Sequence, residues 1–228
     1  MDNATASDAS VFQDAETSTE TDRQARLNRI LEIISAILLS LATVGSAWCA
    51  YQSARWNGVQ AISFSAANGA RTESVRMSNE ALQLASIDVG MFTQLATAYS
   101  EENEFLFNFI MDRFRPEMKP AVEAWIATEP LKNPEAPSSP FAMAEYTSAA
   151  QDEADRLLGV AEQSLQDAQA ANQNSDNYVL LTVMFASVLF FGGISTKFDM
   201  FKIRAALIAF GILIFTAGLV ILATYPIY

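Results

Sequence analysis

The sequence predicts an all-α integral membrane protein with three transmembrane helices and an extracytoplasmic antiparallel helical bundle between the first and the second. Two observations carry this prediction. Three apolar runs are each long enough to cross a bilayer, and the long stretch between the first two is polar, acidic and rich in helix-forming residues. A third observation, the placement of the basic residues, predicts the orientation of the chain.

The apolar runs cover residues 30–51, 178–196 and 205–225, and Glu32 is their one charged residue. A helix of about 20 residues crosses ~30 Å of hydrocarbon at ~1.5 Å per residue. A buried core helix could explain one such run, but three runs without a polar stripe indicate membrane spans. The first run starts late and follows an acidic leader, which argues against a cleaved signal peptide. We therefore predict transmembrane helices at 23–51, 178–196 and 205–225.

Basic residues flank the predicted spans on one side. Arg23, Arg26 and Arg29 precede the first span, and Lys197, Lys202 and Arg204 lie in a basic loop, 197–204. Cytoplasmic loops carry the excess of Lys and Arg, so the N-terminus and this loop are predicted to be cytoplasmic. Residues 52–177 and the C-terminal residues 226–228 are then extracytoplasmic.

Charge and composition bound the possible partners. Residues 52–177 hold 8 Lys and Arg against 18 Asp and Glu, a formal charge of −10. Such a surface repels nucleic acid, and we expect no nucleic-acid partner. Residues 1–22 are acidic and contain almost no large apolar side chains, so we predict a disordered cytoplasmic tail there.

Several kinds of chemistry are disfavoured. Cys49 is the single cysteine and histidine is absent, which removes disulfides, the commonest general base and the commonest metal ligand. The chain has no Gly-rich phosphate loop, nucleophile elbow or HExxH motif. We expect no catalytic residue, no cofactor and no metal site, and the protein is not predicted to be an enzyme.

The outer segment reads as helices joined by loops. A helix continues outward from the first span, a short Phe-rich hairpin covers residues 101–128, and the proline-rich residues 129–140 form an irregular loop. A return helix begins near Ala144. The hairpin is predicted to pack back along the outgoing helix and to bury its phenylalanines. Asp88 interrupts the apolar seam of the outgoing helix, and we expect Ile87 to take its place and Asp88 to face solvent.

A ladder of small residues runs along the outer half of the first span and just beyond it. Its members are Ala42, Gly45, Ser46, Cys49, Ala50, Ser53 and Ala54. Small residues three or four apart let transmembrane helices approach closely, so the ladder predicts a helix-packing interface, within the chain or between copies. Chance is a competing explanation, since alanine is frequent throughout the chain.

Aromatic residues cluster at the predicted outer ends of the spans. They are Trp48, Tyr51, Trp56, Tyr178, Tyr225 and Tyr228. Amphipathic rings favour the boundary between lipid and water, so we interpret this set as an interfacial aromatic belt. A ligand-binding aromatic pocket is the alternative.

The segment AWCAYQSARWNGVQ closes the first span, and a helical domain and two spans joined by a short basic loop follow it. This layout resembles uncharacterised bacterial inner-membrane proteins of three spans, which are grouped under domains of unknown function. In those families an aromatic residue and a Tyr-Gln pair close the first span. The matching positions here are Trp48, Tyr51, Gln52, Arg55 and Trp56. The resemblance implies a bacterial origin and the topology given above, and no activity.

These features favour a non-enzymatic oligomeric scaffold or accessory subunit that acts through helix–helix contacts. Its expected partners are the lipid bilayer and either further copies of the chain or a larger membrane complex. A homo-oligomeric channel with an acidic outer vestibule is the alternative, with a polar lining offered by Ser35, Ser40, Thr43 and Ser46. A sensor that signals to the acidic tail ranks third, because residues 1–29 hold no recognisable output module.

Overall fold

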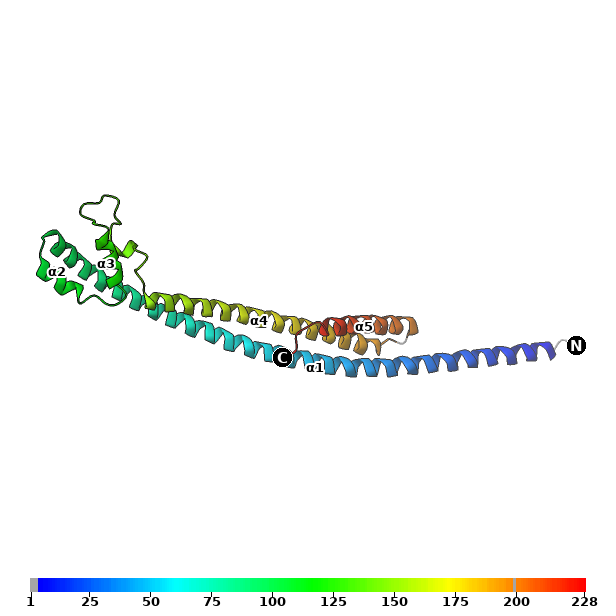
Figure 1. The fold of residues 1–228 in the computed structure, drawn as a ribbon. Helices are drawn as coiled ribbons and strands as arrows, with labels where there is room; N and C mark the ends of the chain where they lie inside the picture. The colour runs from blue at the N-terminus through cyan, green and yellow to red at the C-terminus, as the bar shows by residue number, and fades with distance from the viewer. Residues whose placement is uncertain (1–3, 199) are drawn as a thin grey trace. The chain divides into compact units, whose positions relative to one another are not determined.

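All regular secondary structure in the described chain is helical, which confirms the predicted all-α class (Figure 1). The computed structural model describes residues 4–198 and 200–228, and side chains from Arg23 onward except that of Gln24. The helices are α1 (Ala4–Ser100), α2 (Glu104–Met111), α3 (Lys119–Ala127), the short 3-10 helix η1 (Pro140–Ala142), α4 (Ala149–Ser195) and α5 (Phe201–Leu222).

Three of these helices, α1, α4 and α5, are long and apolar enough to cross a membrane. Large apolar side chains such as Val44, Val183 and Leu213 lie on their outer surfaces, more than half exposed. In water such exposure would be costly, whereas hydrocarbon solvates these groups well. The three helices thus indicate a membrane protein, as the apolar runs predict.

Helix α1 begins earlier than expected. Its first residue is Ala4, within the segment 1–22 that the sequence predicts to be disordered. The segment has no proline, and its Ala, Glu and Gln residues are compatible with a helical backbone. Residues 1–3 lie outside the described chain, as do the side chains of the whole segment. The predicted disorder of this tail therefore stays a prediction.

The chain divides into two units, which are described separately. Unit 1 comprises residues 1–61 and 168–228, and unit 2 comprises residues 62–167. In unit 1, α1 and α4 pack against each other in opposite directions. The Ser35 hydroxyl donates to the carbonyl oxygen of Gly192 at 3.2 Å, and the Ser53 and Ser175 hydroxyls hydrogen-bond at 2.9 Å.

Phe185 of α4 forms the centre of unit 1 and is fully buried. A Cβ atom added at Gly45 of α1 would lie 3.2 Å from this ring, and one added at Gly218 of α5 would lie 3.3 Å from it. Two glycines on different helices therefore make room for one aromatic ring. Phe215 of α5 completes the contact, with its ring centroid 5.7 Å from that of Phe185.

In unit 2, α1 and α4 again pack in opposite directions. The hydroxyl of Ser74 donates to the carbonyl oxygen of Ala154 at 2.7 Å. Five buried side chains of α1 in this unit recur every seven residues, namely Ala67, Ser74, Ala81, Asp88 and Leu95, and Ala98 is buried as well. On α4 small residues face them, since Ala150, Ala154 and Ala161 are all buried. Such small side chains allow the two backbones to lie close together.

Helices α2 and α3 pack on the end of α1 in unit 2. Leu95, Ile110, Phe114, Met118 and Val122 form their shared buried cluster. The predicted hairpin therefore packs on the outgoing helix, but not with all its phenylalanines inside. Phe105 is 82% exposed and Phe109 is 45% exposed. An eight-residue helix presents only one side to its neighbour, and on α2 that side carries Ile110.

The expectation for Asp88 is wrong. Asp88 is 1% exposed, whereas Ile87 is 57% exposed. The Arg115 guanidinium donates from Nε to both Asp88 carboxylate oxygens, at 3.0 and 2.8 Å, and its Nη2 lies 2.7 Å from Oδ2. This hydrogen bonding raises the pKa of Arg115. A buried carboxylate is tolerated here because a partly buried guanidinium donates hydrogen bonds to both of its oxygens.

Two further boundaries can be compared with the structure. The loop predicted at 129–140 has no helix until η1 begins at Pro140. Helix α4 begins at Ala149 and not near Ala144, because the Ser148 hydroxyl accepts a hydrogen bond from the Gln151 backbone N–H at 3.3 Å. A serine that satisfies a free N–H of the first turn favours a helix start at that point.

Candidate helix-packing site

The small-residue ladder on α1 divides between two sides of the helix. Ala42, Cys49 and Ser53 are buried inside unit 1, and Gly45 meets the Phe185 ring. Ala42 packs with Leu38 and Val188 in one apolar cluster, and Cys49 packs with Tyr178 and Leu181 in another. These ladder positions hold α1 against α4 and α5 of the same chain.

The other ladder positions lie elsewhere. Ser46 is half-buried, and Ala50 and Ala54 are exposed. Ser40 and Ala47 are also exposed and continue the same side of the helix at steps of three, four and seven residues. The Ser40 hydroxyl donates to the Ala36 carbonyl oxygen at 2.8 Å, so it adds little polarity to this side. We call these four exposed residues (Ser40, Ala47, Ala50 and Ala54) the outer small face.

The predicted aromatic belt also separates into two groups. Trp48 and Tyr51 are 42% and 53% exposed, and their ring centroids lie 5.9 Å apart. Both rings are positioned to contact lipid or water at the end of the first apolar segment, as an interfacial belt requires. Of the other four, Tyr225 and Tyr228 lie in the C-terminal residues after α5, and Trp56 and Tyr178 contact those residues.

Trp56 and Tyr178 bind the same backbone oxygen. The Trp56 indole Nε1–H donates to the Pro226 carbonyl oxygen at 3.2 Å, and the Tyr178 hydroxyl donates to that oxygen at 3.1 Å. Tyr178 is fully buried and packs edge-on against Tyr225, with ring centroids 5.8 Å apart. Two donors from α1 and α4 thus fix one carbonyl that follows α5.

Tyr228 is held by neighbouring residues of α1. Its backbone N–H donates to the Gln52 side-chain oxygen Oε1 at 3.2 Å, and the Arg55 guanidinium lies 4.4 Å from the centroid of its ring. Trp56 packs edge-on against the same ring at 5.7 Å. These contacts and the two to Pro226 form what we call the C-terminal anchor, which ties α1, α4 and the segment after α5 together.

Sequence reasoning missed the role of Gln52 and Pro226 in this anchor. Gln52 is fully buried, and its Nε2 has no hydrogen-bond partner among the described residues. A glutamine at the end of an apolar run normally suggests a solvated position. Its place one turn before Trp56, next to Tyr51, was the one available signal, and it gave no indication of a partner 176 residues further along the chain.

The described residues offer few groups for chemistry. Among the side chains that the structure describes (residues 23, 25–198 and 200–228), no group of three or more Cys, Asp or Glu lies where it could hold a metal ion. Asp88 is buried and paired with Arg115, which also lies 3.4 Å from a Glu117 carboxylate oxygen. What the arrangement of unit 1 provides is helix packing and anchoring. The expectations of no catalysis and no cofactor stay predictions.

No family model, no curated protein and no solved structure matches this chain. The resemblance to uncharacterised three-span proteins of bacterial inner membranes therefore stays a prediction.

Proposed function

We propose that this chain is a non-enzymatic membrane scaffold or accessory subunit that acts through helix–helix contacts, with further copies of itself or within a larger complex. The observation that carries the proposal is the outer small face of α1. Within unit 1, the same helix uses Ala42, Gly45 and Cys49 to pack against its own chain. Ala47, Ala50 and Ala54 repeat that spacing on a side of α1 that is exposed in the described part of the chain.

Small exposed residues have a specific meaning in lipid. The hydrophobic effect does not drive helices together there, so close van der Waals packing between backbones has to supply the attraction. A large side chain such as Leu41, 51% exposed on another side of α1, contacts lipid well and needs no partner. Alanines at Ala47, Ala50 and Ala54 leave the backbone accessible to another helix.

Cross-linking in native membranes tests this proposal. In a Cys49→Ala background, Ala50→Cys places a thiol on the outer small face, and Leu41→Cys places one on another exposed side of α1 as a matched control. We expect mild oxidation or a bifunctional maleimide to link Ala50→Cys to a second copy or to a distinct protein, and to leave Leu41→Cys unlinked. Equal behaviour of the two variants, with monomers alone in native-mass measurements, would contradict the proposal.

We further propose that the protein lies in a bacterial inner membrane with its N-terminus in the cytoplasm and residues 52–177 outside. The support is the concentration of basic residues before the first span and at 197–204. In the Cys49→Ala background, a thiol at Ser138 should react with a membrane-impermeant maleimide in intact cells. A thiol at Thr196 should react only after permeabilisation, and the reverse pattern would invert the topology.

The channel alternative has less support. Ser35, Ser40 and Thr43 each donate their hydroxyl to a backbone carbonyl oxygen, at 3.2, 2.8 and 2.8 Å. Hydroxyls bound in this way offer a weak lining to a passing ion. Liposomes that contain the purified protein should show the same ion flux as empty vesicles, and a reproducible cation flux would favour the channel.

A further inference from the structure

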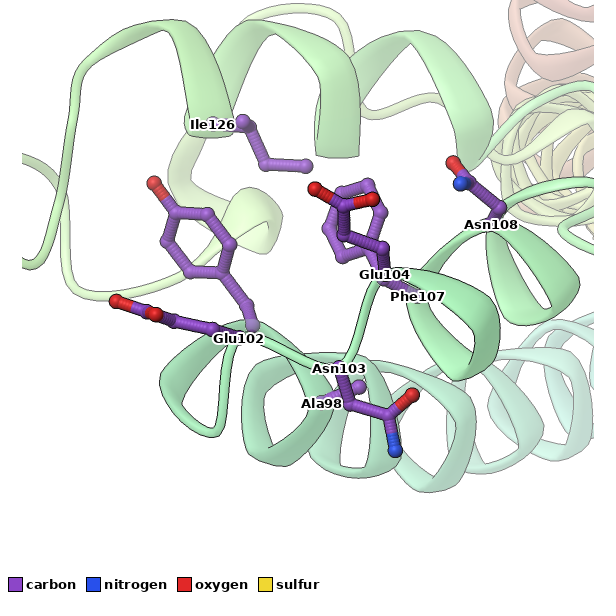
Figure 2. A pocket seen from close by; sticks show the side chains of 8 residues that line it. Ala98, Glu102, Asn103, Glu104, Phe107, Asn108 and Ile126 are labelled. Atoms are coloured by element: carbon purple, nitrogen blue, oxygen red, sulfur yellow. The ribbon is translucent and has the colours of Figure 1, made fainter.

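Unit 2 contains an open pocket of about 670 Å³ between the end of α1, the start of α2 and the side of α3 (Figure 2). Its volume falls within the roughly 300–1,000 Å³ typical of small-molecule sites. No residue of the small-residue ladder or the C-terminal anchor lines it. The pocket is therefore separate from the proposed helix-packing function and needs its own explanation.

Half of the residues that line the pocket are aromatic or apolar. Tyr99 of α1 and Phe107 of α2 both line it, with ring centroids 5.9 Å apart and ring planes inclined by 39°. Ile126 of α3 forms a further wall. Aromatic faces carry partial negative charge and attract cations that lie within about 6 Å of the ring centroid.

The charged groups of the pocket are both acidic. Glu102 and Glu104 line it, and no Lys or Arg does. Neither glutamate takes part in an ion pair within the part of the chain that the structure describes. Figure 2 shows the carboxylate of Glu104 directed toward Ile126 across the pocket, with Glu102 at its edge. Two carboxylates beside aromatic rings select for positive charge.

The backbone that presents these groups is firmly held. The N–H of Asn103 donates to the Ala98 carbonyl oxygen at 2.9 Å, and the Asn103 side chain accepts from the Leu106 N–H at 3.1 Å and so caps α2. Glu102 lies within the turn that the first of these bonds closes, and its φ is 51°. A site whose backbone is already fixed loses little entropy when a ligand binds.

We propose that this pocket binds a small organic cation, with its ammonium group beside Glu102, Glu104 and the two aromatic rings and its apolar part against Ile126. The walls favour an alkylated ammonium over a bare metal ion, because a metal ion gains nothing from Ile126 and requires several oxygen ligands at close range. Negative charge without a paired cation excludes an anionic ligand.

Binding of choline to the full-length protein in phosphatidylglycerol nanodiscs tests the proposal. Isothermal titration or saturation-transfer NMR should detect choline binding at micromolar to millimolar concentration. The control ligand is 3,3-dimethylbutan-1-ol, in which an uncharged carbon replaces the nitrogen. We expect it to bind at least roughly tenfold more weakly, since it keeps the shape and loses the charge. Equal binding of the two compounds, or no choline binding, would overturn the proposal.

Matched variants locate the site. Glu102→Gln, Glu104→Gln and Phe107→Leu should each weaken choline binding roughly threefold to tenfold. Glu101→Gln is the control, because it removes the same charge from an exposed neighbour that does not line the pocket. Circular dichroism verifies that each variant keeps its helices. If Glu101→Gln weakens binding as much as the pocket variants do, attraction to the acidic surface explains the binding and the pocket proposal fails.

The ammonium group could belong to a lipid headgroup or to a free solute. A measurement in nanodiscs of a second lipid distinguishes the two sources. In phosphatidylcholine nanodiscs, an unchanged choline affinity identifies the ligand as a free cation. An affinity that falls in proportion to the headgroup content shows that the same site binds the lipid headgroup. Cross-linking through the outer small face should be unaffected by choline, so either proposal can fail without the other.

Discussion

At the scale of single residues, Arg115 stabilises unit 2 because it is the partner of the buried Asp88 carboxylate. Replacing Arg115 with Met leaves that carboxylate unpaired in an apolar setting. We expect the free energy of unfolding to fall by about 3 kcal/mol, the typical cost of breaking a buried ion pair from one side. Thermal unfolding followed by circular dichroism measures this change.

The double variant Asp88→Leu, Arg115→Met is the control for this prediction. It removes both charges together, and replacing a buried pair by apolar groups is often neutral or stabilising. We therefore expect its unfolding temperature to return close to that of the original chain. A double variant as unstable as Arg115→Met alone would show that the packing of Arg115, and not its charge, is what unit 2 requires.

We expect the C-terminal anchor to weaken when the side-chain oxygen of Gln52 is removed. Its side-chain oxygen accepts from the Tyr228 N–H, a bond worth about 0.5–1.5 kcal/mol. Gln52→Leu keeps the buried volume and removes that acceptor, so the Tyr228 amide should exchange its hydrogen about tenfold faster. Gln83→Leu, at an exposed position of unit 2, is the control and should leave this exchange unchanged.

At the scale of helices, α1 offers two glycines with opposite expected responses to the same substitution. Gly69 has no atom within 4 Å of an added Cβ, so Gly69→Ala should stabilise the helix by about 0.5–1 kcal/mol. At Gly45 the added Cβ would lie 3.2 Å from the Phe185 ring, which Gly218 confines from the other side. Gly45→Ala should therefore lower the unfolding temperature. The same sign of change in both variants would contradict this account.

The ion pair between Glu73 and Arg76 makes the stability of α1 depend on pH. The Arg76 guanidinium donates to the Glu73 carboxylate at 2.6 Å, and this hydrogen bond lowers the pKa of Glu73. A group whose pKa is lower in the folded state stabilises the fold above its unfolded pKa, and the effect is lost as the pH falls through the lowered value. Arg76→Gln should raise the pKa of Glu73 in a carboxyl ¹³C NMR titration, while Arg71→Gln should not.

At the scale of the whole molecule, the proline-rich loop is the place where the chain can be cut without loss of its packing. Lys132 lies in this exposed loop between α3 and η1. In unit 1 and in unit 2, contacts between α1 and α4 join the parts before and after the cut. Limited trypsin digestion should cleave after Lys132 and give two fragments that purify together in mild detergent. Separation of the fragments before denaturation would contradict this.

Much of the architecture could be predicted from local pattern, because membrane spans and proline-rich loops are properties of adjacent residues. Contacts between distant residues could not. Nothing near Asp88 in the sequence points to Arg115, and nothing near Gln52 points to Tyr228. Of the ladder on the first span, Ala42 and Cys49 are buried, and its role as an interface stays a prediction. Its division into two sides depends on where α4 and α5 lie, which the ladder itself does not encode.

The contact between Phe185 and the glycines has a consequence for the alanine-lined helices outside the apolar segments. Three small buried side chains of α1, Ala67, Ser74 and Ala81, are seven residues apart, so a shift of α4 along α1 by seven residues would bring it to a similar surface there. The same shift would bring Phe185 from Gly45 to Leu38 or Gln52, where its ring does not fit. The Phe185 ring in the apolar segment thus fixes the register of two helices whose small-residue contacts elsewhere would be similar in either register.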